Sequence, residues 1–144
     1  MGEFSHNLDA KGRLIVPACF REELGGNLVV TQGLDGCLTL YTQEAWEKIY
    51  AQLQTLPTTK AQTRAFVRIL TSQARSTEVD SQGRILIPSN LIKLANIKKA
   101  CVIIGAGSKV EIWAKETWEE YIANSQESFE ELAESLTEFT LWNM

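Results

Sequence analysis

The sequence of 144 residues has only one histidine and three cysteines, and these low counts exclude several classes of protein. With no CxxC or HExxH pattern, a zinc site would lack ligands. Cys19, Cys37 and Cys101 are odd in number and lie in apolar contexts, so we expect three buried thiols in a reducing compartment rather than a disulfide framework. A Cys–His nucleophile pair would have to use His6. The sequence therefore favours a protein that is not an enzyme and that needs no cofactor and no metal.

Long apolar runs are also absent. The longest, Ala100–Ile104, is far shorter than the ~18 residues that a membrane span requires. Met1–Phe4 contains no basic residue of the kind that opens a secretory signal. Hydrophobic residues make up 44% and charged residues 22%, an ordinary globular balance. We expect a soluble, cytoplasmic protein without a membrane partner.

Basic residues are outnumbered overall, but the excess of acid is confined to one end. Residues 111–138 contain nine glutamates and one lysine, whereas residues 1–110 contain 13 basic and nine acidic side chains. The first part therefore has a net charge of +4 although the whole chain has −4. Because phosphate binding depends on local potential, the acidic end does not exclude a basic face elsewhere.

An internal repeat organises the sequence. Asp9–Pro17 (DAKGRLIVP) recurs 71 residues later as Asp80–Pro88 (DSQGRILIP), and the similarity continues with a slip of one residue. The continuing matches are Val30–Gly33 with Val102–Gly105, Leu38–Leu40 with Val110–Ile112, and Trp46-Glu47 with Trp118-Glu119. Such shared order indicates two copies of one structural unit.

Each copy predicts a strand, a turn, a second strand, a short helix, a hairpin and a helix. An aspartate opens each turn and a glycine supplies its positive φ angle, in the pairs Asp9 with Gly12 and Asp80 with Gly83. The apolar runs at 14–16 and 85–87 are typical of strands buried on both faces. Further strands are expected at 28–31, 37–41, 100–104 and 109–113, a helix capped by Thr42, and short helices ended by Gly25-Gly26 and by Asn96.

Two more helices are expected outside the copies. In 57–75, Phe66, Ile69 and Leu70 would face inward, while Lys60, Arg64 and Arg68 form a basic stripe. That stripe is either a solvated helix face or an electrostatic or subunit contact. At 125–136, the apolar face of an acidic helix is formed by Phe129, Leu132, Ala133 and Leu136, and we expect 137–144 to be a loosely held tail.

A copy of ~45 residues rarely buries enough surface to fold alone, so we expect the two copies to interleave their strands around one core. The expected organisation is a first repeat at 1–54, a linker helix at 55–76, a second repeat at 77–124, and an acidic helix and tail at 125–144.

The basic residues of the turns are the candidate functional residues. Lys11 and Arg13 flank the first turn glycine, whereas Gln82 and Arg84 flank the second. Each arginine could pair with the aspartate that opens its own turn, or present its guanidinium to phosphates or to guanine. The spacing alone favours neither alternative.

The paired motifs, separated by a helix, resemble the AbrB-type (SpoVT–AbrB) motifs of the MraZ family of bacterial transcriptional regulators, over nearly the whole chain. The resemblance implies a mainly β fold with helices, a pseudo-dimeric, swapped-hairpin β-barrel. It also implies a ring-shaped homo-oligomer, such as an octamer, at the nucleoid. The ring would bind double-stranded DNA at short G-rich direct repeats upstream of the division and cell-wall gene cluster, which includes its own gene.

On this resemblance, the DNA-contacting positions are Lys11, Gly12, Arg13, Gln82, Gly83 and Arg84. Gln82 departs from the pattern because it lacks a charge, so the two halves would contribute unequally to phosphate binding. One alternative function is a ring-forming scaffold or partner-binding protein that docks through its acidic end. Another is an antitoxin-like module, which the second copy disfavours because such modules typically have a single copy and a disordered tail.

Overall fold

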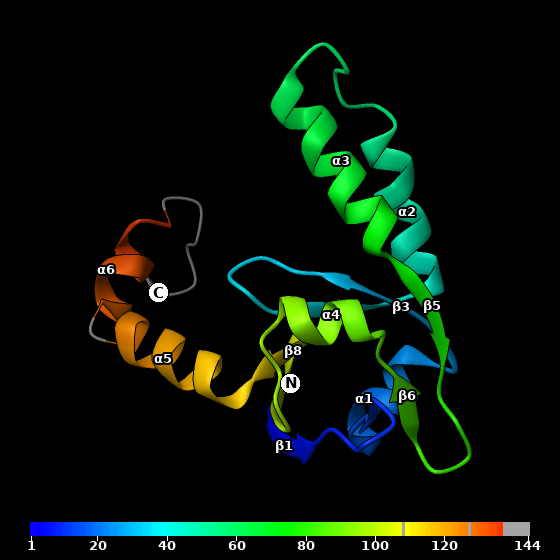
Figure 1. Ribbon diagram of the computed structural model, residues 1–144. Helices are drawn as coiled ribbons and strands as arrows, with labels where there is room; N and C mark the ends of the chain where they lie inside the picture. The colour runs from blue at the N-terminus through cyan, green and yellow to red at the C-terminus, as the bar shows by residue number, and fades with distance from the viewer. Residues whose placement is uncertain (108, 127, 137–144) are drawn as a thin grey trace.

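The computed structural model describes residues 1–107, 109–126 and 128–136, which form a mixed α/β fold (Figure 1). The first copy consists of β1 (Glu3–Asn7), β2 (Arg13–Ile15), α1 (Ala18–Leu24), β3 (Asn27–Gln32), β4 (Leu38–Thr42) and α2 (Gln43–Leu53). After α3 (Ala61–Gln73), the second copy consists of β5 (Arg75–Glu78), β6 (Arg84–Leu86), α4 (Ser89–Leu94), β7 (Ala100–Ala106), β8 (Lys109–Ala114) and α5 (Lys115–Gln126). A last helix, α6, spans Phe129–Glu134. The predicted order of elements is confirmed, but helical residues outnumber strand residues, so the fold is mixed rather than mainly β.

The strands of the two copies are interleaved. In a six-stranded antiparallel sheet of order β1-β7-β8-β4-β3-β5, each edge strand belongs to one copy and pairs with a strand of the other: β1 with β7, and β5 with β3. A separate two-stranded ribbon pairs β2 with β6, so that Leu14 lies opposite Ile85. The expectation of interleaved copies is therefore confirmed.

One hydrophobic core joins the copies. It contains Leu14, Val16 and Phe20 from the first copy together with Ile85, Ile87 and Leu91 from the second, all at most 2% exposed. Burying side chains of this size contributes ~1.5–3 kcal/mol each. Neither copy could retain this stabilisation alone, because each supplies only part of the contacts.

The expected barrel is not confirmed. β1 and β5 remain edge strands of the large sheet, and the β2–β6 ribbon is a separate sheet, so the ladder is not closed. The prediction that 14–16 and 85–87 are buried on both faces is wrong: Ile15 is 40% and Leu86 56% exposed. A two-stranded ribbon covers the core with one face only, and alternate side chains point to opposite faces of a strand.

Three predicted helix boundaries are confirmed by their local geometry. The Thr42 hydroxyl accepts a hydrogen bond from the Ala45 amide at 2.9 Å and caps α2. Gly25, with φ 77°, ends α1, and Asn96, with φ 56°, follows the end of α4. Glycine and asparagine are the residues that adopt this left-handed conformation most readily.

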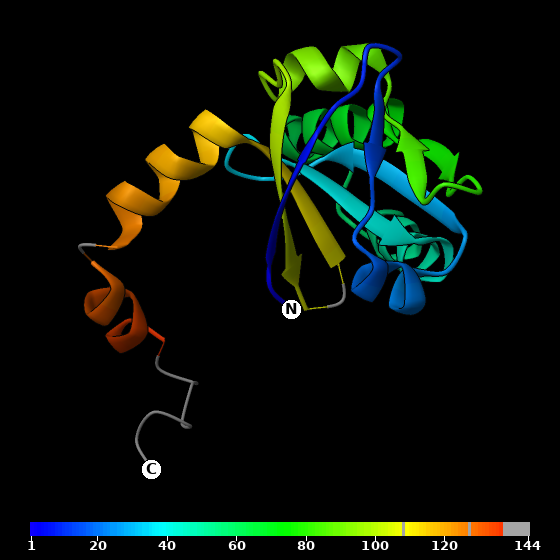
Figure 2. The ribbon, with the colours of Figure 1, turned by 90° about the horizontal axis from the view of Figure 1, so that it is seen from below.

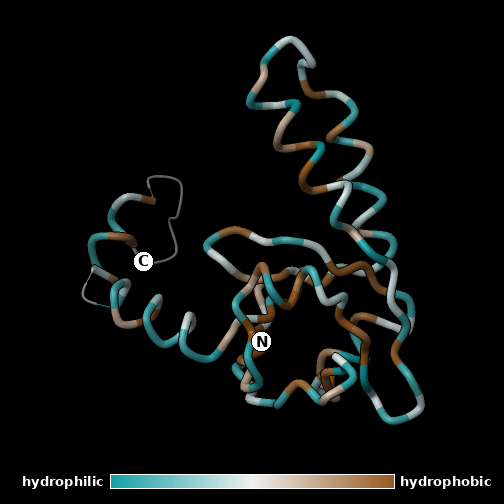
Figure 3. Tube along the Cα trace, in the orientation of Figure 1, coloured by the Kyte–Doolittle hydropathy of each residue, from teal (hydrophilic) through white to brown (hydrophobic). Residues whose placement is uncertain are grey.

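Helices α2 and α3 form a hairpin that projects from the sheet on the side away from the β5–β6 turn (Figure 1). The Thr31 hydroxyl donates a hydrogen bond to the Leu70 carbonyl at 3.0 Å, which ties α3 to β3. Hydrophobic stretches recur along both helices (Figure 3). The prediction that α3 buries its apolar face is wrong, since Phe66 and Ile69 are about half exposed. A two-helix projection has no second layer to cover that face.

Helices α5 and α6 extend away from the sheet as an arm (Figure 2). At its base, the Trp113 ring packs 5.1 Å from Trp118 and 4.9 Å from Tyr121, measured between ring centroids. The expected single helix at 125–136 is two elements instead, because α5 ends at Gln126 and α6 begins at Phe129. The predicted tail at 137–144 lies outside the described residues. Among the residues described, no helix has both the length and the apolarity to cross a membrane.

The prediction of three buried thiols is wrong for one of them. Cys37 and Cys101 are buried, whereas Cys19 is exposed on α1. Burial raises the pKa of the Cys37 thiol to about 12, with Glu111 adding to the effect, and raises the pKa of Cys101 to about 11.

These environments predict the order in which the thiols react. With a thiol-specific reagent at neutral pH, one equivalent per chain, Cys19, should react rapidly, because the thiolate is the nucleophile and the other two thiols are shielded and protonated. Denaturant should release the remaining two. The Cys19→Ser variant, which should show no rapid phase, is the control, and rapid reaction of all three thiols would contradict the described burial.

Candidate nucleic-acid interface

The two copies form turns with the same hydrogen-bond pattern. One carboxylate oxygen of Asp9 accepts hydrogen bonds from the amides of Lys11 and Arg13 at 2.9 and 2.8 Å. The corresponding oxygen of Asp80 accepts from the amides two and four residues later, both at 2.9 Å. The turn glycines have φ angles of 81° and 80°, and each donates its amide to the carbonyl of the opening aspartate. The Asp-x-x-Gly-Arg spacing therefore defines a closed turn.

The second carboxylate oxygen of each aspartate holds an arginine. Arg13 Nε lies 2.8 Å from Asp9 Oδ2, and Arg84 Nε lies 2.9 Å from Asp80 Oδ2. The ion pairs, one of the two alternatives that the sequence left open, are thus present, but they occupy Nε, one of the five N–H donors of a guanidinium. Both arginine side chains are partly exposed, at 32% and 23%. The ion pair and a nucleic-acid contact are therefore compatible, because the pair orients a guanidinium whose terminal amino groups remain available.

Both aspartates are held in the charged form. The pKa of Asp9 is lowered, most strongly by the backbone hydrogen bond from Arg13, against a smaller opposing effect of desolvation. The pKa of Asp80 is lowered in the same way by the amide of Arg84. Hydrogen bonds to a carboxylate favour its ionised form. The turns therefore keep their shape throughout the neutral range.

The strand exchange places the turns side by side. The Val16 amide donates to the Gly83 carbonyl at 2.9 Å, and the Ile87 amide donates to the Gly12 carbonyl at 2.8 Å. Arg84 Nη1 also approaches Asp9 Oδ2, to 3.9 Å, so the charged groups of the two turns are neighbours. Residues 71 positions apart thus form one surface.

The six candidate residues have different positions on this surface. Lys11 and Gln82 are exposed at the tips, and the two arginines lie beside them, partly exposed. Gly83 is buried: a Cβ built on it would overlap the guanidinium of Arg21, a residue of α1. Arg21 is a neighbour that the sequence did not reveal, because only the strand exchange brings α1 to the second turn.

The surface has the features of a binding site for an anionic partner. Among residues 1–107, 109–126 and 128–136, no three His, Cys, Asp or Glu side chains are grouped to hold a metal ion. The glutamates of α5 and α6 lie on the projecting arm rather than among the turns (Figure 2). The arrangement can therefore present cationic hydrogen-bond donors to an anionic partner.

The fold and the site together define a class: a pseudo-dimeric protein whose interleaved halves each contribute an arginine-bearing turn to one surface. The family model described as "MraZ protein, putative antitoxin-like" matches residues 1–69 and 70–140. The chain belongs to the MraZ family. Its similarity to individual members covers nearly the full length of both chains.

Three relatives illustrate this similarity, and each is named "Transcriptional regulator MraZ". The protein from Thermoanaerobacter sp. (strain X514) is 52% identical over 98% of this chain and 99% of its own. The protein from Desulforamulus reducens is 52% identical over 96% and 97%, and that from Ligilactobacillus salivarius is 50% identical over 98% and 99%. The expected family is confirmed, and the name of these relatives is that of a regulator rather than an enzyme.

The lowered aspartate pKa values predict how the turns respond to acid. Because the folded-state pKa of Asp80 lies below its usual 3.8, the turn adds stability that is fully present above that pH. This stability is lost as the pH falls through the folded-state pKa. Asp80→Ala should therefore lower the melting temperature at pH 7, and the difference from the parent protein should shrink as the pH approaches about 3.

The matched control is Glu44→Ala, which removes an exposed carboxylate paired with Lys48 on α2. Calorimetry of the three proteins between pH 7 and about 3 measures the effect. If the melting temperature of Asp80→Ala differs from that of the parent protein by the same amount at every pH, this carboxylate does not anchor the turn.

Proposed function

We propose that this protein is a sequence-specific, DNA-binding transcriptional regulator that contacts double-stranded DNA through its paired turns. The observation that supports this most directly is the juxtaposition of Arg13 and Arg84, each held through Nε by the aspartate of its own turn and each partly exposed. The regulator name of the relatives supports the same function. Lys11, Gly12, Arg13, Gln82, Gly83 and Arg84 form the proposed contact region, in which the glycines shape the turns.

The side chains of the turns would make different contacts with DNA according to their chemistry. A guanidinium held at Nε can present its two terminal nitrogens to O6 and N7 of guanine in the major groove. Lys11 is a flexible point charge suited to phosphate, and Gln82 offers a neutral amide. Such a surface favours guanine-containing sites while phosphate contacts fix its orientation.

We propose the target on the basis of the family resemblance. It consists of short G-rich direct repeats upstream of the division and cell-wall gene cluster that includes the protein's own gene, bound at the nucleoid in the cytoplasm. The basic residues of one chain give weak, salt-sensitive binding. A ring that presents the turns repeatedly to repeated boxes raises affinity without new contacts. In this proposal the repeats at 1–54 and 77–124 bind DNA. The two-stranded ribbon and the six-stranded sheet together form a swapped-hairpin barrel whose strands are not joined by a closed ladder of hydrogen bonds.

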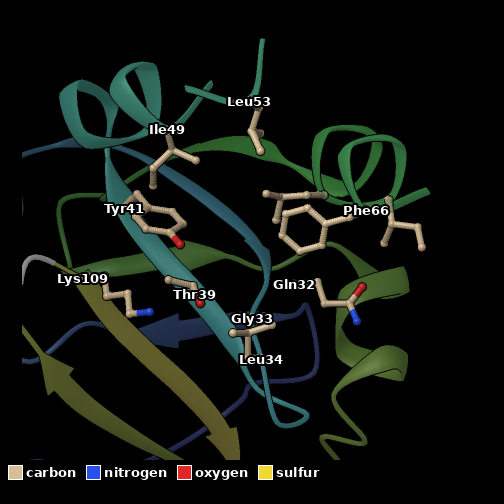
Figure 4. A pocket seen from close by; sticks show the side chains of 11 residues that line it. Gln32, Gly33, Leu34, Thr39, Tyr41, Ile49, Leu53, Phe66 and Lys109 are labelled. Atoms are coloured by element: carbon tan, nitrogen blue, oxygen red, sulfur yellow. The ribbon is translucent and has the colours of Figure 1, made fainter. Parts of the chain in front are cut away.

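A groove beside the projecting hairpin is a candidate contact for that ring. Its volume is about 430 Å³, and it lies between the α2–α3 hairpin and the β3–β4 strands (Figure 4). Tyr41, Ile49, Leu53 and Phe66 line it. Apolar surface of this kind, exposed beside polar residues, marks interaction sites.

We propose that the arm of a neighbouring copy fills this groove. The arm exposes Tyr121, Ile122, Phe129 and Leu132, and its glutamates complement the basic stripe of 60–68 on the hairpin. The groove and the arm are different surfaces, so the contact between neighbouring copies is heterologous. Repetition of this contact closes a ring when the rotation that relates one copy to the next adds up to a full turn. The linker at 55–76 and the end at 125–144 would then serve assembly.

Loss of the first turn's guanidinium should abolish specific recognition. For Arg13→Ala we expect a loss of ~1–3 kcal/mol in discrimination for each contacted base. A gel-shift titration at two salt concentrations would use DNA from upstream of the protein's own gene and the same DNA with its boxes scrambled. Size-exclusion chromatography with light scattering should show unchanged assembly.

The Arg13→Lys variant separates charge from geometry, because lysine keeps the charge but not the two-nitrogen fork. It should retain phosphate binding and lose discrimination. Equal weak binding of the parent protein to both probes would contradict a specific regulator and favour the scaffold alternative.

The assembly proposal predicts that a charge in the groove dissociates the ring. Phe66→Glu should lower the mass measured by light scattering, because a buried, unpaired carboxylate destabilises an apolar contact. Tyr50→Glu is the matched control, since Tyr50 is as exposed as Phe66 (47% against 48%) but does not line the groove. An unchanged mass for Phe66→Glu would exclude this groove as the contact.

A further inference from the structure

The second turn has a cationic neighbour from the other copy. Arg21 lies on α1, which follows the first turn in the sequence, yet its guanidinium lies over Gly83 of the second turn. A Cβ on Gly83 would stand 2.7 Å from the Arg21 Cζ and would overlap a terminal nitrogen. The exchange of strands thus gives the second turn a guanidinium that its own copy does not supply.

The first turn has an apolar residue at the corresponding place. Arg21 is the fourth residue after Pro17, and Ile92 is the fourth residue after Pro88. A Cβ on Gly12 would stand 3.5 Å from the Ile92 Cδ1. The two short helices therefore cover opposite turns in equivalent ways, but one covers its turn with a cation and the other with a hydrocarbon side chain.

This difference is complementary to the difference between the turn tips. The first turn has Lys11 at its tip and Ile92 above its glycine, whereas the second has Gln82 at its tip and Arg21 above its glycine. Each turn also has its own arginine. With Arg21 included, each turn therefore has two cationic side chains.

Arg21 is not neutralised by acidic side chains. Within the part of the chain that the structure describes, it forms no ion pair within 4.0 Å, and its side chain makes no hydrogen bond. Glu22 and Glu23 follow it on α1, but residues one and two positions apart on a helix do not face each other. Arg21 is partly exposed, and it is its guanidinium rather than its aliphatic stem that lies closest to the glycine.

We infer that Arg21 binds a phosphate of the DNA engaged by the second turn and supplies the positive charge that Gln82 lacks. This inference rests on the proposed function. It replaces the expectation of unequal halves that follows from Gln82 alone, because the two turns then offer equal charge through residues from different copies.

The experiment measures how DNA affinity depends on salt, because each phosphate contact contributes about 0.9 to the slope of log affinity against log salt. The full-length protein is titrated with DNA from upstream of its own gene at several salt concentrations. Arg21→Ile places the residue of the other half over Gly83 and keeps its apolar cover. It should weaken binding and reduce the slope by about 1 for each second turn engaged.

A second substitution tests the exchange of charge directly. Gln82→Lys alone should tighten binding and steepen the slope. Combined with Arg21→Ile, it should restore a slope close to that of the parent protein, since one cation replaces another at the same turn. Lys48→Ala, which removes a cation paired with Glu44 on α2, is the control and should leave the slope unchanged.

The outcomes separate this inference from the proposed function. If the parent protein prefers intact boxes and Arg13→Ala loses that preference, while Arg21→Ile binds with an unchanged slope, the role of Arg21 is overturned and the regulator is retained. If the parent protein does not prefer the boxes at all, both are overturned. Circular dichroism melting of Arg21→Ile identifies a loss of affinity caused by unfolding. In that case Gln82→Lys alone provides the decisive comparison, and an unchanged slope for it would overturn the inference that this turn faces a phosphate.

Discussion

The structure depends on the exchange of strands between two halves that are each too small to fold alone. β1 leaves its own copy to pair with β7, β5 pairs with β3, and the two ribbon strands β2 and β6 pair with each other. This exchange allows one core to be built from both halves, which is how ~45-residue units obtain enough buried surface. It also has a functional consequence. Because β2 and β6 each begin at a turn, their pairing forces the turns to lie together, so the same contacts that stabilise the protein also assemble its proposed interface.

The aspartate of each turn links this architecture to recognition. One carboxylate oxygen closes the turn through two backbone amides, and the other holds the arginine at Nε. Ion pairs with this degree of exposure contribute little to stability. Their value lies in orientation, since a guanidinium fixed at one nitrogen loses less conformational entropy when it binds a base or a phosphate. The separation of the acidic arm from the turns is consistent with this role, because it keeps the glutamates of α5 and α6 away from the surface that we propose binds DNA.

Errors in the sequence-based predictions share a physical origin. The apolar runs at 14–16 and 85–87 correctly predicted strands, but Ile15 and Leu86 are exposed because the ribbon has no second layer on that side. The pattern in 57–75 correctly predicted a helix, but Phe66 lies on a projecting hairpin and remains half exposed. Cys19 has an apolar context in the sequence and yet faces solvent. Periodicity and composition reflect the conformation of a segment, whereas exposure depends on which other segments cover it.

Local chemistry was therefore readable from the sequence. Aspartate, glycine and arginine at fixed spacing specify a turn through interactions within five residues, and their repetition indicated two copies, a shared core and the family. Only the tertiary structure decided which helix lies over which turn. Arg21 precedes Gly83 by more than sixty residues, and nothing in its own neighbourhood distinguishes it from a solvated helix residue. Its position follows from the strand exchange, a long-range pairing set by the burial of both halves rather than by local propensity.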